Sequence, residues 1–600
     1  MIWAWILEEG RRYLLGNVGR GTVESVVSKK QEQSEPAQPE GEEAETAFQG
    51  RRWPGDHVVD IDLRSMALLR VAMAVLLFLD TAIRMSDIPA MYSDWGSLSR
   101  TSLLELGWNA NWFSIHMGTG HPKGIAVLMS LQLLCAVGLF LGWRTRWMTF
   151  WSWLFLISLH SRNPMVLNGG DIYLRVVLFW MLFLPWGQTW SLDARAGRTD
   201  TRWWTPPLSE NGKAVRSLAG IGVLFQISVV YWFAALPKTD PSWTATYTAT
   251  NLALMLDTFI TPLGMFVRNA FWEWLPTMTF LVIHWEFYGP WLWWFPFDRG
   301  QMRTLGVFGF VAMHTGFGTC MELGLFAWIG VCMPLVLLPA WFWERPARKL
   351  TAFWDARAAT RWVEPAPYGQ ESPLRWFPRE FFFYAVIFYT LLWNLGNENL
   401  SPKLRLPPNS QWFGQMTRLD QRWNMFSPGP LTEDGWFVIE GTRRDGSKVD
   451  MWNPGASDQV SFEKPEWIAF TFPNERWRKY MMNLWMSDNS RYRLPFGQYL
   501  TRKFNSKGRG PREVVEFKIY YMKEITNPDG SEQPPEKVMI WHHWCFDEPK
   551  SDLGKGVKDA APRPLKEEAQ AKKPGPPKTE PLNWGSTPSS PSPTPSPVAK

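Results

Sequence analysis

The sequence predicts a polytopic α-helical membrane bundle of about nine spans, followed by a C-terminal β-rich or α+β extracytoplasmic domain. Long apolar stretches recur through the first two thirds of the 600-residue chain. Lys and Arg are frequent in every second loop between these stretches and rare in the others. The chain contains 40 Trp residues, and dense pairs of them at the ends of apolar stretches, such as Trp293 with Trp294 and Trp341 with Trp343, are typical of side chains at a membrane interface.

The apolar stretches place the nine spans in order along the chain, at 66–84, 124–142, 147–160, 172–187, 217–236, 274–297, 303–320, 324–343 and 379–395. Several are shorter than the roughly 20 residues that a helix needs to cross a bilayer, so their boundaries are soft. Residues 251–272 are also apolar, and we interpret them as an interfacial or re-entrant helix.

The basic residues determine the predicted orientation. They cluster before the first span, after the second, fourth and sixth spans and after the eighth span, at 345–361. Cytoplasmic loops carry the excess of Lys and Arg, which predicts a cytoplasmic N-terminus and an extracytoplasmic C-terminal domain in a cell (inner) membrane. The net charge of +6 is small for this length. We therefore expect the lipid bilayer, and not nucleic acid, as a partner.

The composition divides the chain into six regions. We predict a partly disordered cytoplasmic region at 1–59, a transmembrane domain at 60–345, a cytoplasmic loop at 346–378, a last transmembrane helix at 379–396, an extracytoplasmic domain at 397–549 and a disordered tail rich in Pro, Ser and Lys at 550–600.

Local signals predict the elements of the C-terminal domain. Two alternating segments flank the turn at Asp445–Gly446, which is typical of a hairpin. Alternation at 515–521, followed by the turn-rich NPDGSEQPP and the segment 538–542, predicts a second strand pair. Residues 474–485 form an amphipathic pattern that starts at Asn474, a favourable N-cap.

Three polar segments interrupt the apolar part, at 92–96, 160–171 and 237–243. The predicted orientation places all three on the non-cytoplasmic side. Polar groups at membrane depth are costly, so they indicate function by default. We expect one site, built from Lys238, His160 and His314 with support from Asn168, Asp171, Asp94, Asp240 and Glu322. The four Cys residues show no zinc spacing, and we predict no metal site.

Five segments in a fixed order resemble the horizontally transferred transmembrane (HTTM) domain family, which includes vitamin K-dependent gamma-carboxylase. They are LLRVAMAVLLFLDTAIR at 68–84, YSDWG at 92–96, LHSRNPMVLNGGD at 159–171, FAALPKTDPSW at 233–243, and His314 followed by CMELGLFAW at 320–328. The segments DGWFVIEG and FPNERWRKYMMNLW resemble the C-terminal regions of bacterial members.

The resemblance implies roles for particular residues. Lys238 resembles the lysine that is viewed as the base starting the oxidation of a vitamin K-type hydroquinone, and His160 and His314 resemble two histidines of the carboxylase. Two positions depart from the family pattern. Glu322 stands where an amide is common, and Pro237 precedes the lysine where the carboxylase has a second lysine.

The residue types support more than one role each. Desolvation at an apolar boundary favours the neutral amine of Lys238, a base, unless Asp240 points toward it, whereas a lysine snorkelling to headgroups is the structural alternative. His160 is suited to a hydrogen bond with a quinone oxygen, to proton relay or to capping. Asp171 is placed to cap the helix that follows. His314 is suited to the site or to helix–helix hydrogen bonding.

We therefore expect a gamma-carboxylase-like membrane enzyme, a lyase or oxidoreductase, that oxidises a quinol or modifies a secreted or membrane protein at the outer face. The alternative is a non-enzymatic membrane scaffold or maturation factor that binds a secreted client. A transporter is the third hypothesis. It ranks below the other two because the paired inverted repeats of many transporters are not evident in the sequence.

Overall fold

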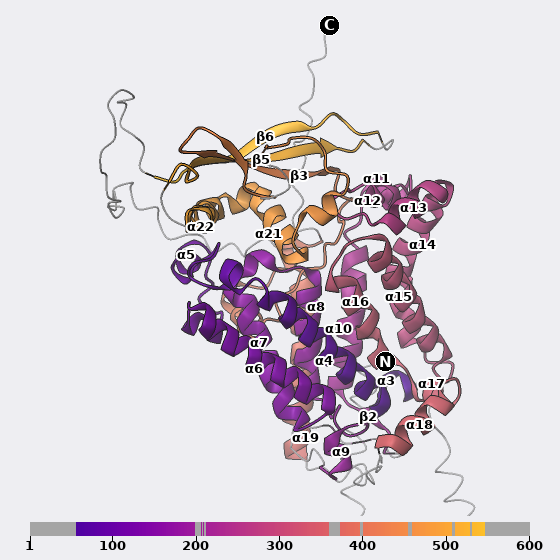
Figure 1. Cartoon of the computed structure of the whole chain (residues 1–600). Coiled ribbons are helices and arrows are strands. Elements are labelled where there is room, and N and C mark those ends of the chain that lie inside the picture. Colours follow the sequence, from indigo (N-terminus) through magenta and orange to yellow (C-terminus); the bar gives the residue numbers. More distant parts are fainter. Residues whose placement is uncertain are drawn as a thin grey trace, which may run out of the picture.

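The computed structural model describes residues 56–198, 206, 208, 212–358, 373–396, 400–453, 459–506, 510–527 and 531–546. Most of the predicted N-terminal region and the whole predicted C-terminal tail lie outside these residues. In Figure 1 a helical part, from indigo to pink, carries a sheet-containing C-terminal part, orange to yellow, on one end. Residues from about 430 onward form this C-terminal part, which we call the module.

Three helices of the described residues are long and apolar enough to cross a membrane: α4 (Leu63–Met85), α6 (Pro122–Leu141) and α10 (Leu218–Ala235). The nine predicted spans are not supported. Two helices are long but less apolar, α7 (Thr145–Arg162) and α15 (Gln301–Cys320). The helix α19 (Pro373–Leu395) is also long, but its first half carries charge.

The remaining predicted spans are short or broken where Pro and Gly interrupt them. The helix α8 (Gly169–Met181) ends before Pro185. The stretch 274–297 divides into α14 (Leu275–Tyr288) and the 3-10 helix η5 (Gly289–Trp294). The stretch 324–343 divides into α16 (Leu325–Cys332), η6 (Met333–Leu337) and α17 (Ala340–Glu344). Proline lacks the N–H that continues a helix, so an apolar run containing it need not form one straight span.

Short elements complete the helical part. Near the end away from the module, α3 (Asp56–Val59) leads into β1 (Asp60–Asp62), which pairs antiparallel with β2 (Ala214–Arg216). The other short elements are η1 (Ile88–Tyr92), α5 (Arg100–Leu106), η2 (Ile115–Gly118), η3 (Pro164–Val166), α9 (Leu192–Arg195), α11 (Pro241–Thr244), α12 (Ala249–Leu254), α13 (Pro262–Ala270), η4 (Trp272–Trp274), α18 (Arg348–Ala358), η7 (Pro402–Leu404), η8 (Pro408–Ser410) and α20 (Trp412–Thr417).

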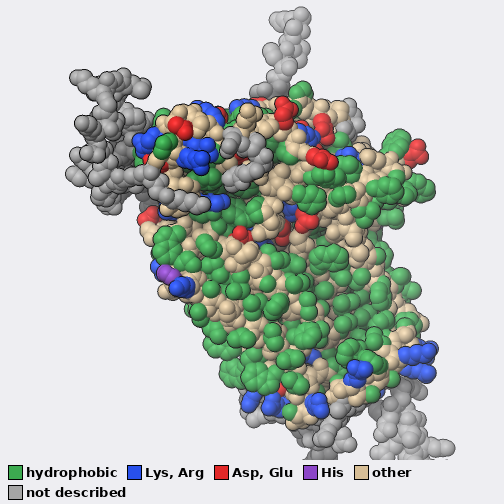
Figure 2. Space-filling view, viewed as in Figure 1, with side chains coloured by type: hydrophobic (Ala, Val, Ile, Leu, Met, Phe, Trp, Pro, Cys, Tyr) green, Lys and Arg blue, Asp and Glu red, His purple; other side chains and the backbone are tan. Residues whose placement is uncertain are grey.

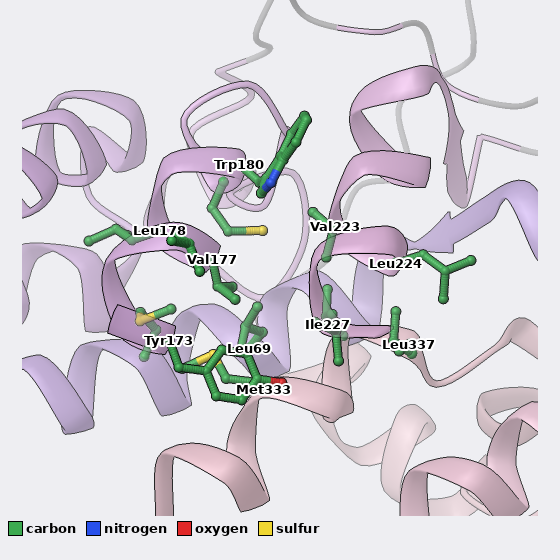
Figure 3. Packing of buried hydrophobic residues seen from close by; sticks show 14 of the residues in the cluster. Leu69, Tyr173, Val177, Leu178, Trp180, Val223, Leu224, Ile227, Met333 and Leu337 are labelled. Carbon is green, nitrogen blue, oxygen red and sulfur yellow. The ribbon is translucent and has the colours of Figure 1, made fainter. Parts of the chain in front are cut away.

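The core lies where α8 and α10 pack against α4 and η6. Figure 3 shows Trp180 and Val177 of α8 beside Val223 and Ile227 of α10, with Met333 below them. All twelve residues of α8 from Gly170 onward are buried, Asp171 and Arg175 among them, so the helix is enclosed on all sides. A helix buried all round is one of the interior elements of a large core.

The lateral surface of the helical part is apolar. Figure 2 shows hydrophobic side chains covering the region between the two ends, with Lys and Arg at the end away from the module. Exposed large hydrophobic residues on α6, α14 and α15 include Val127, Leu134, Leu281 and Leu305. A contiguous apolar surface of this kind is compatible with membrane association.

The module contains a four-stranded antiparallel sheet in the order β4-β3-β5-β6. The strands are β3 (Glu433–Arg443), β4 (Lys448–Asp450), β5 (Val514–Ile525) and β6 (Glu536–Trp544). Both predicted strand pairs are confirmed. The predicted amphipathic helix is α21 (Glu475–Trp485), and the Asn474 side chain caps it by accepting from the backbone N–H of Arg476. A second helix, α22 (Arg493–Asn505), lies beside it.

The C-terminal chain contacts all three polar segments that the sequence singled out. Arg502 donates to the Gly96 carbonyl at 2.9 Å, and Asn483 Nδ2 donates to the Met165 carbonyl at 2.8 Å. The Ser427 hydroxyl donates to the Pro237 carbonyl at 3.0 Å. The three segments therefore lie at the same end of the helical part, as predicted.

Candidate functional site

A buried ion network joins the module to the helical part. Arg84 of α4 bonds Asp80 one turn earlier at 2.9 Å and Asp171 of α8 at 2.5 Å. Arg476 of α21 bonds Asp80 at 2.7 Å and Asp171 at 2.6 Å. All four side chains are buried. The i,i+4 pair of Asp80 and Arg84 is thus half of a network of two cations and two anions.

The Asn168 turn positions Asp171 in this network. Asn168 accepts from the Asp171 N–H at 3.2 Å, and the Asp171 carboxylate accepts from the Asn168 N–H at 2.8 Å. This reciprocal capping box starts α8 with Asn168 as the N-cap, and Asp171 takes part in the capping from the third position of the helix. The Asn168 side-chain amide also donates to Glu475 of α21.

His160 lies beside the network. Its Nε2 is 3.5 Å from Asp171 Oδ1, its side chain is fully buried, and neither ring nitrogen makes a hydrogen bond with the described residues. The helix α7 ends two residues later, and the ring does not cap it. His160 is therefore a buried polar side chain without a hydrogen bond to the described residues. A buried polar group of this kind is a candidate for a chemical role.

The ligand atoms of Asp80, His160 and Asp171 lie within 4.8 Å of one another, close enough to share one ion. Both carboxylates, however, already accept bonds from Arg84 and Arg476. The two guanidinium groups thus neutralise the carboxylates in the position where a metal ion would do so.

Lys238 follows the end of α10 and is buried, with 5% of its surface exposed. Its Nζ donates to Glu286 of α14 and lies 4.3 Å from the centre of the Trp243 ring. A lysine that snorkels to headgroups would be exposed and unpaired. Lys238 is buried and paired, so it does not snorkel in this structure. Asp240 does not bond Lys238 but caps α11 by accepting from the Ser242 N–H at 2.8 Å.

His314 of α15 contacts Tyr231 of α10. Its Nε2 is 3.0 Å from the Tyr231 hydroxyl, and its Nδ1 makes no hydrogen bond with the described residues. Tyr231 lies in the last turns of α10, and Lys238 lies three residues after the helix ends at Ala235. Glu286 interacts electrostatically with Tyr231 as well as binding Lys238. Lys238, Glu286, Tyr231 and His314 therefore form one polar group, which we call the α10 group.

The α10 group and the ion network flank the same two segments. The ring of Phe326 lies edge-on to His314, with centroids 6.0 Å apart, and a Cβ added at Gly169 would lie 3.4 Å from that ring. Trp243 Nε1 donates to the Phe426 carbonyl at 2.9 Å, while a Cβ added at Gly169 would lie 3.5 Å from the Met425 sulfur. Phe326 and the 425–426 segment thus separate the two clusters.

Three predicted residues lie outside both clusters, and one of them is Asp240, which caps α11. Asp94 pairs with Arg100 at 2.7 Å, and both side chains are 34% exposed. The backbone of Glu322 donates to the Phe259 carbonyl at 2.6 Å, and its carboxylate acts electrostatically on Arg478. The predicted single site is therefore divided between two clusters, with Asp94 and Glu322 at its periphery.

Several residues of the site were not among those predicted: Glu286, Tyr231, Arg476 and Lys479. Lys479 of α21 is half-buried, and no hydrogen bond or ion pair to the described residues is found for its amine. Burial lowers the pKa of Lys479, and Glu475 and Asp171 act in the opposite direction. The sequence signal for Lys479 was its position one turn after Glu475, within the NERWRKY segment that resembles bacterial members of the family.

The segment 251–272, predicted as interfacial or re-entrant, contacts the module. Asp434 of β3 accepts from the Thr258 N–H at 3.0 Å and from the Thr258 hydroxyl. Lys464 bonds Asp257 at 2.7 Å and Glu524 of β5 at 2.8 Å. These contacts fix the segment against the sheet, outside the long apolar helices.

We predict that the stability of this contact depends on pH through Asp434. Burial raises the pKa of the Asp434 carboxyl to about 6, although the bonds from Thr258 oppose the shift. The unfolded chain has a carboxyl pKa of about 3.9, so the folded state binds the proton more tightly. The free energy of unfolding should therefore fall by roughly 2 to 3 kcal/mol as the pH rises from about 4 to about 6.

Melting temperatures of wild type and Asp434→Asn between pH 4 and 7 test this. The difference between them should change across this range, because the variant lacks the titrating group, whereas the exposed Asp488→Asn should follow wild type. Parallel curves for wild type and Asp434→Asn would contradict the assignment.

Comparison of the chain with protein-family models, with curated proteins and with solved structures finds no match.

Proposed function

We propose that the protein is a multi-pass membrane enzyme of the HTTM type that oxidises a quinol, or modifies a protein, at the extracytoplasmic face of a cell (inner) membrane. The apolar lateral surface and the basic end opposite the module support this orientation. The charge pattern of the loops supports additional spans that are shorter or broken, as well as the three long apolar helices.

The observation that carries the proposal is the α10 group. An amine, a carboxylate, a phenol and an imidazole lie together among apolar helices, where ionisable groups are costly and indicate function. Moving one proton from Lys238 to Glu286 converts the ion pair into a neutral amine and a neutral acid. A neutral amine in an apolar site is a base, which is the role that the family resemblance implies for Lys238.

The surroundings suit a hydroquinone. Trp243 and Phe326 offer flat apolar faces beside the polar atoms, and His314 Nδ1 is unbonded among the described residues. A bound vitamin K-type hydroquinone would react with oxygen to give the quinone epoxide and water, and would supply all four electrons that reduce the oxygen molecule. With its own proton moved to Glu286, Lys238 would accept the phenolic proton, and the protonated amine would pair with the resulting phenolate. His314 with Tyr231 would orient the hydroquinone or relay a proton.

The test is product formation in lipid nanodiscs supplied with a reduced naphthoquinone and oxygen. Mass spectrometry should detect the quinone epoxide, with water as the second product, from wild type. His314→Phe should reduce its rate by about 100-fold, the lower range of general acid–base contributions, while the exposed Lys448→Ala should not. Absence of epoxide with several quinols, from folded protein, would refute the quinol-oxidising proposal.

A non-enzymatic scaffold that binds a secreted client is the second candidate. The ion network favours it, because Arg476 ties the module to the residues around His160 through bonds that serve structure. Under this alternative, variants of the α10 group retain function when folded, whereas exposed positions of the module within 436–485 are sensitive in a client-binding assay.

A further inference from the structure

An apolar corner projects from the helical part next to the module, where α13, η4 and the start of α14 meet. Gly264 is the one buried residue of α13, and the corner exposes Leu263, Phe266, Phe271, Trp272 and Trp274. Trp272 is 66% exposed and Phe266 is 60% exposed. Figure 2 shows a hydrophobic region with acidic side chains at its edge at the upper right, where Figure 1 places α13. Exposed aromatic residues beside a helix end are typical of the headgroup layer of a membrane.

A cleft of about 390 Å³ opens at this corner, lined by Thr248, Asn251, Trp272, Glu273 and Pro276. Its polar groups are a carboxylate, an amide and a hydroxyl, set beside an indole face. Glu273 is exposed and forms no ion pair with the described residues. Arg268, on the same segment, donates to Asn269 and to the Leu254 carbonyl.

We propose that this cleft binds the amine-bearing headgroup of a zwitterionic phospholipid, with the ammonium held between the Trp272 ring and the Glu273 carboxylate. A cation over the face of a tryptophan is attracted by the ring quadrupole, and an adjacent carboxylate adds a charge-assisted bond. Asn251 and Thr248 supply donors for the phosphate. The acyl chains lie against the apolar residues of α13.

The chemistry of the cleft favours this headgroup over an anionic one. The carboxylate of Glu273 repels a headgroup that carries net negative charge, and the described lining offers no Lys or Arg to compensate. The exposed apolar side chains continue directly from the cleft through Trp272, so headgroup and acyl chain meet one continuous surface. The proposal does not depend on the enzymatic proposal, since it concerns a separate surface.

The test is lipid retention by the full-length protein, released from mixed micelles of phosphatidylethanolamine and phosphatidylglycerol and measured by native mass spectrometry. Wild type should retain phosphatidylethanolamine about tenfold over phosphatidylglycerol, the ratio that about 1.4 kcal/mol produces. Glu273→Gln and Trp272→Leu should each remove most of this preference. Trp274→Leu and Glu105→Gln, at exposed positions outside the cleft lining, should keep it.

The charge reversal Glu273→Lys gives the sharpest result, because it should invert the preference toward phosphatidylglycerol. Glu273 is exposed, so the substitution disturbs no buried contact. Equal retention of both lipids by wild type would overturn the proposal. So would a wild-type preference that survives both Glu273→Gln and Trp272→Leu, since the binding would then lie elsewhere on the apolar surface.

Discussion

Replacing Arg476 by Met is expected to lower the free energy of unfolding by about 3 to 5 kcal/mol, the usual cost of removing one partner from a buried ion pair. The substitution leaves Asp80 and Asp171 with Arg84 as their remaining guanidinium partner. One of the two buried carboxylates would then be uncompensated. Thermal or chemical unfolding in lipid nanodiscs measures the loss, and limited proteolysis reports whether the module detaches from the helical part.

Arg444 provides the matched control. It also pairs with a carboxylate, Glu513 at 2.7 Å, but its side chain is 54% exposed. Solvent-exposed pairs contribute up to about 1 kcal/mol, so Arg444→Met should change stability by no more than that. An Arg476→Met protein that unfolds with wild type would show that the network does not hold the module in place.

The second large effect concerns Lys238 and Glu286. Lys238→Met should destabilise the protein by about 3 to 5 kcal/mol, because it leaves the buried Glu286 carboxylate without its cation. The double variant Lys238→Met/Glu286→Leu removes both charges and replaces them with apolar side chains of similar volume. Such replacements are often neutral, so the double variant should unfold within about 1 kcal/mol of wild type.

The comparison of single and double variants separates charge pairing from packing. A double variant as unstable as the sum of Lys238→Met and Glu286→Leu would show that the two side chains act independently, against the ion pair described here. Melting curves of the four proteins in one lipid composition complete the cycle.

Local sequence signals predicted much of the structure. Asn474 was recognised as a cap because its side chain acts on N–H groups two and three residues later. Asp171 was placed at the start of α8 for the same reason, since the capping box is contained within four residues. The two strand pairs followed from alternation on either side of turns that are close in sequence.

Long-range pairing was not available from the sequence. Arg476 and Asp80 are separated by 396 positions, and Lys238 and Glu286 by 48. Nothing in the pattern around either residue specifies its partner, because the geometry depends on how helices pack. The structure does not support nine spans for a related reason. Hydropathy measures apolar composition, whereas Pro290 and Pro334 determine where the helices break.

The most direct test of the central claim is quinol oxidation by the Lys238→Met/Glu286→Leu protein. The stability cycle first establishes that this variant folds, so loss of activity cannot be attributed to unfolding. With a reduced naphthoquinone and oxygen, wild type should form epoxide and the folded double variant should form none above background. Epoxide formed by the folded double variant at the wild-type rate would show that Lys238 and Glu286 are structural, and that the α10 group is not the site of the reaction.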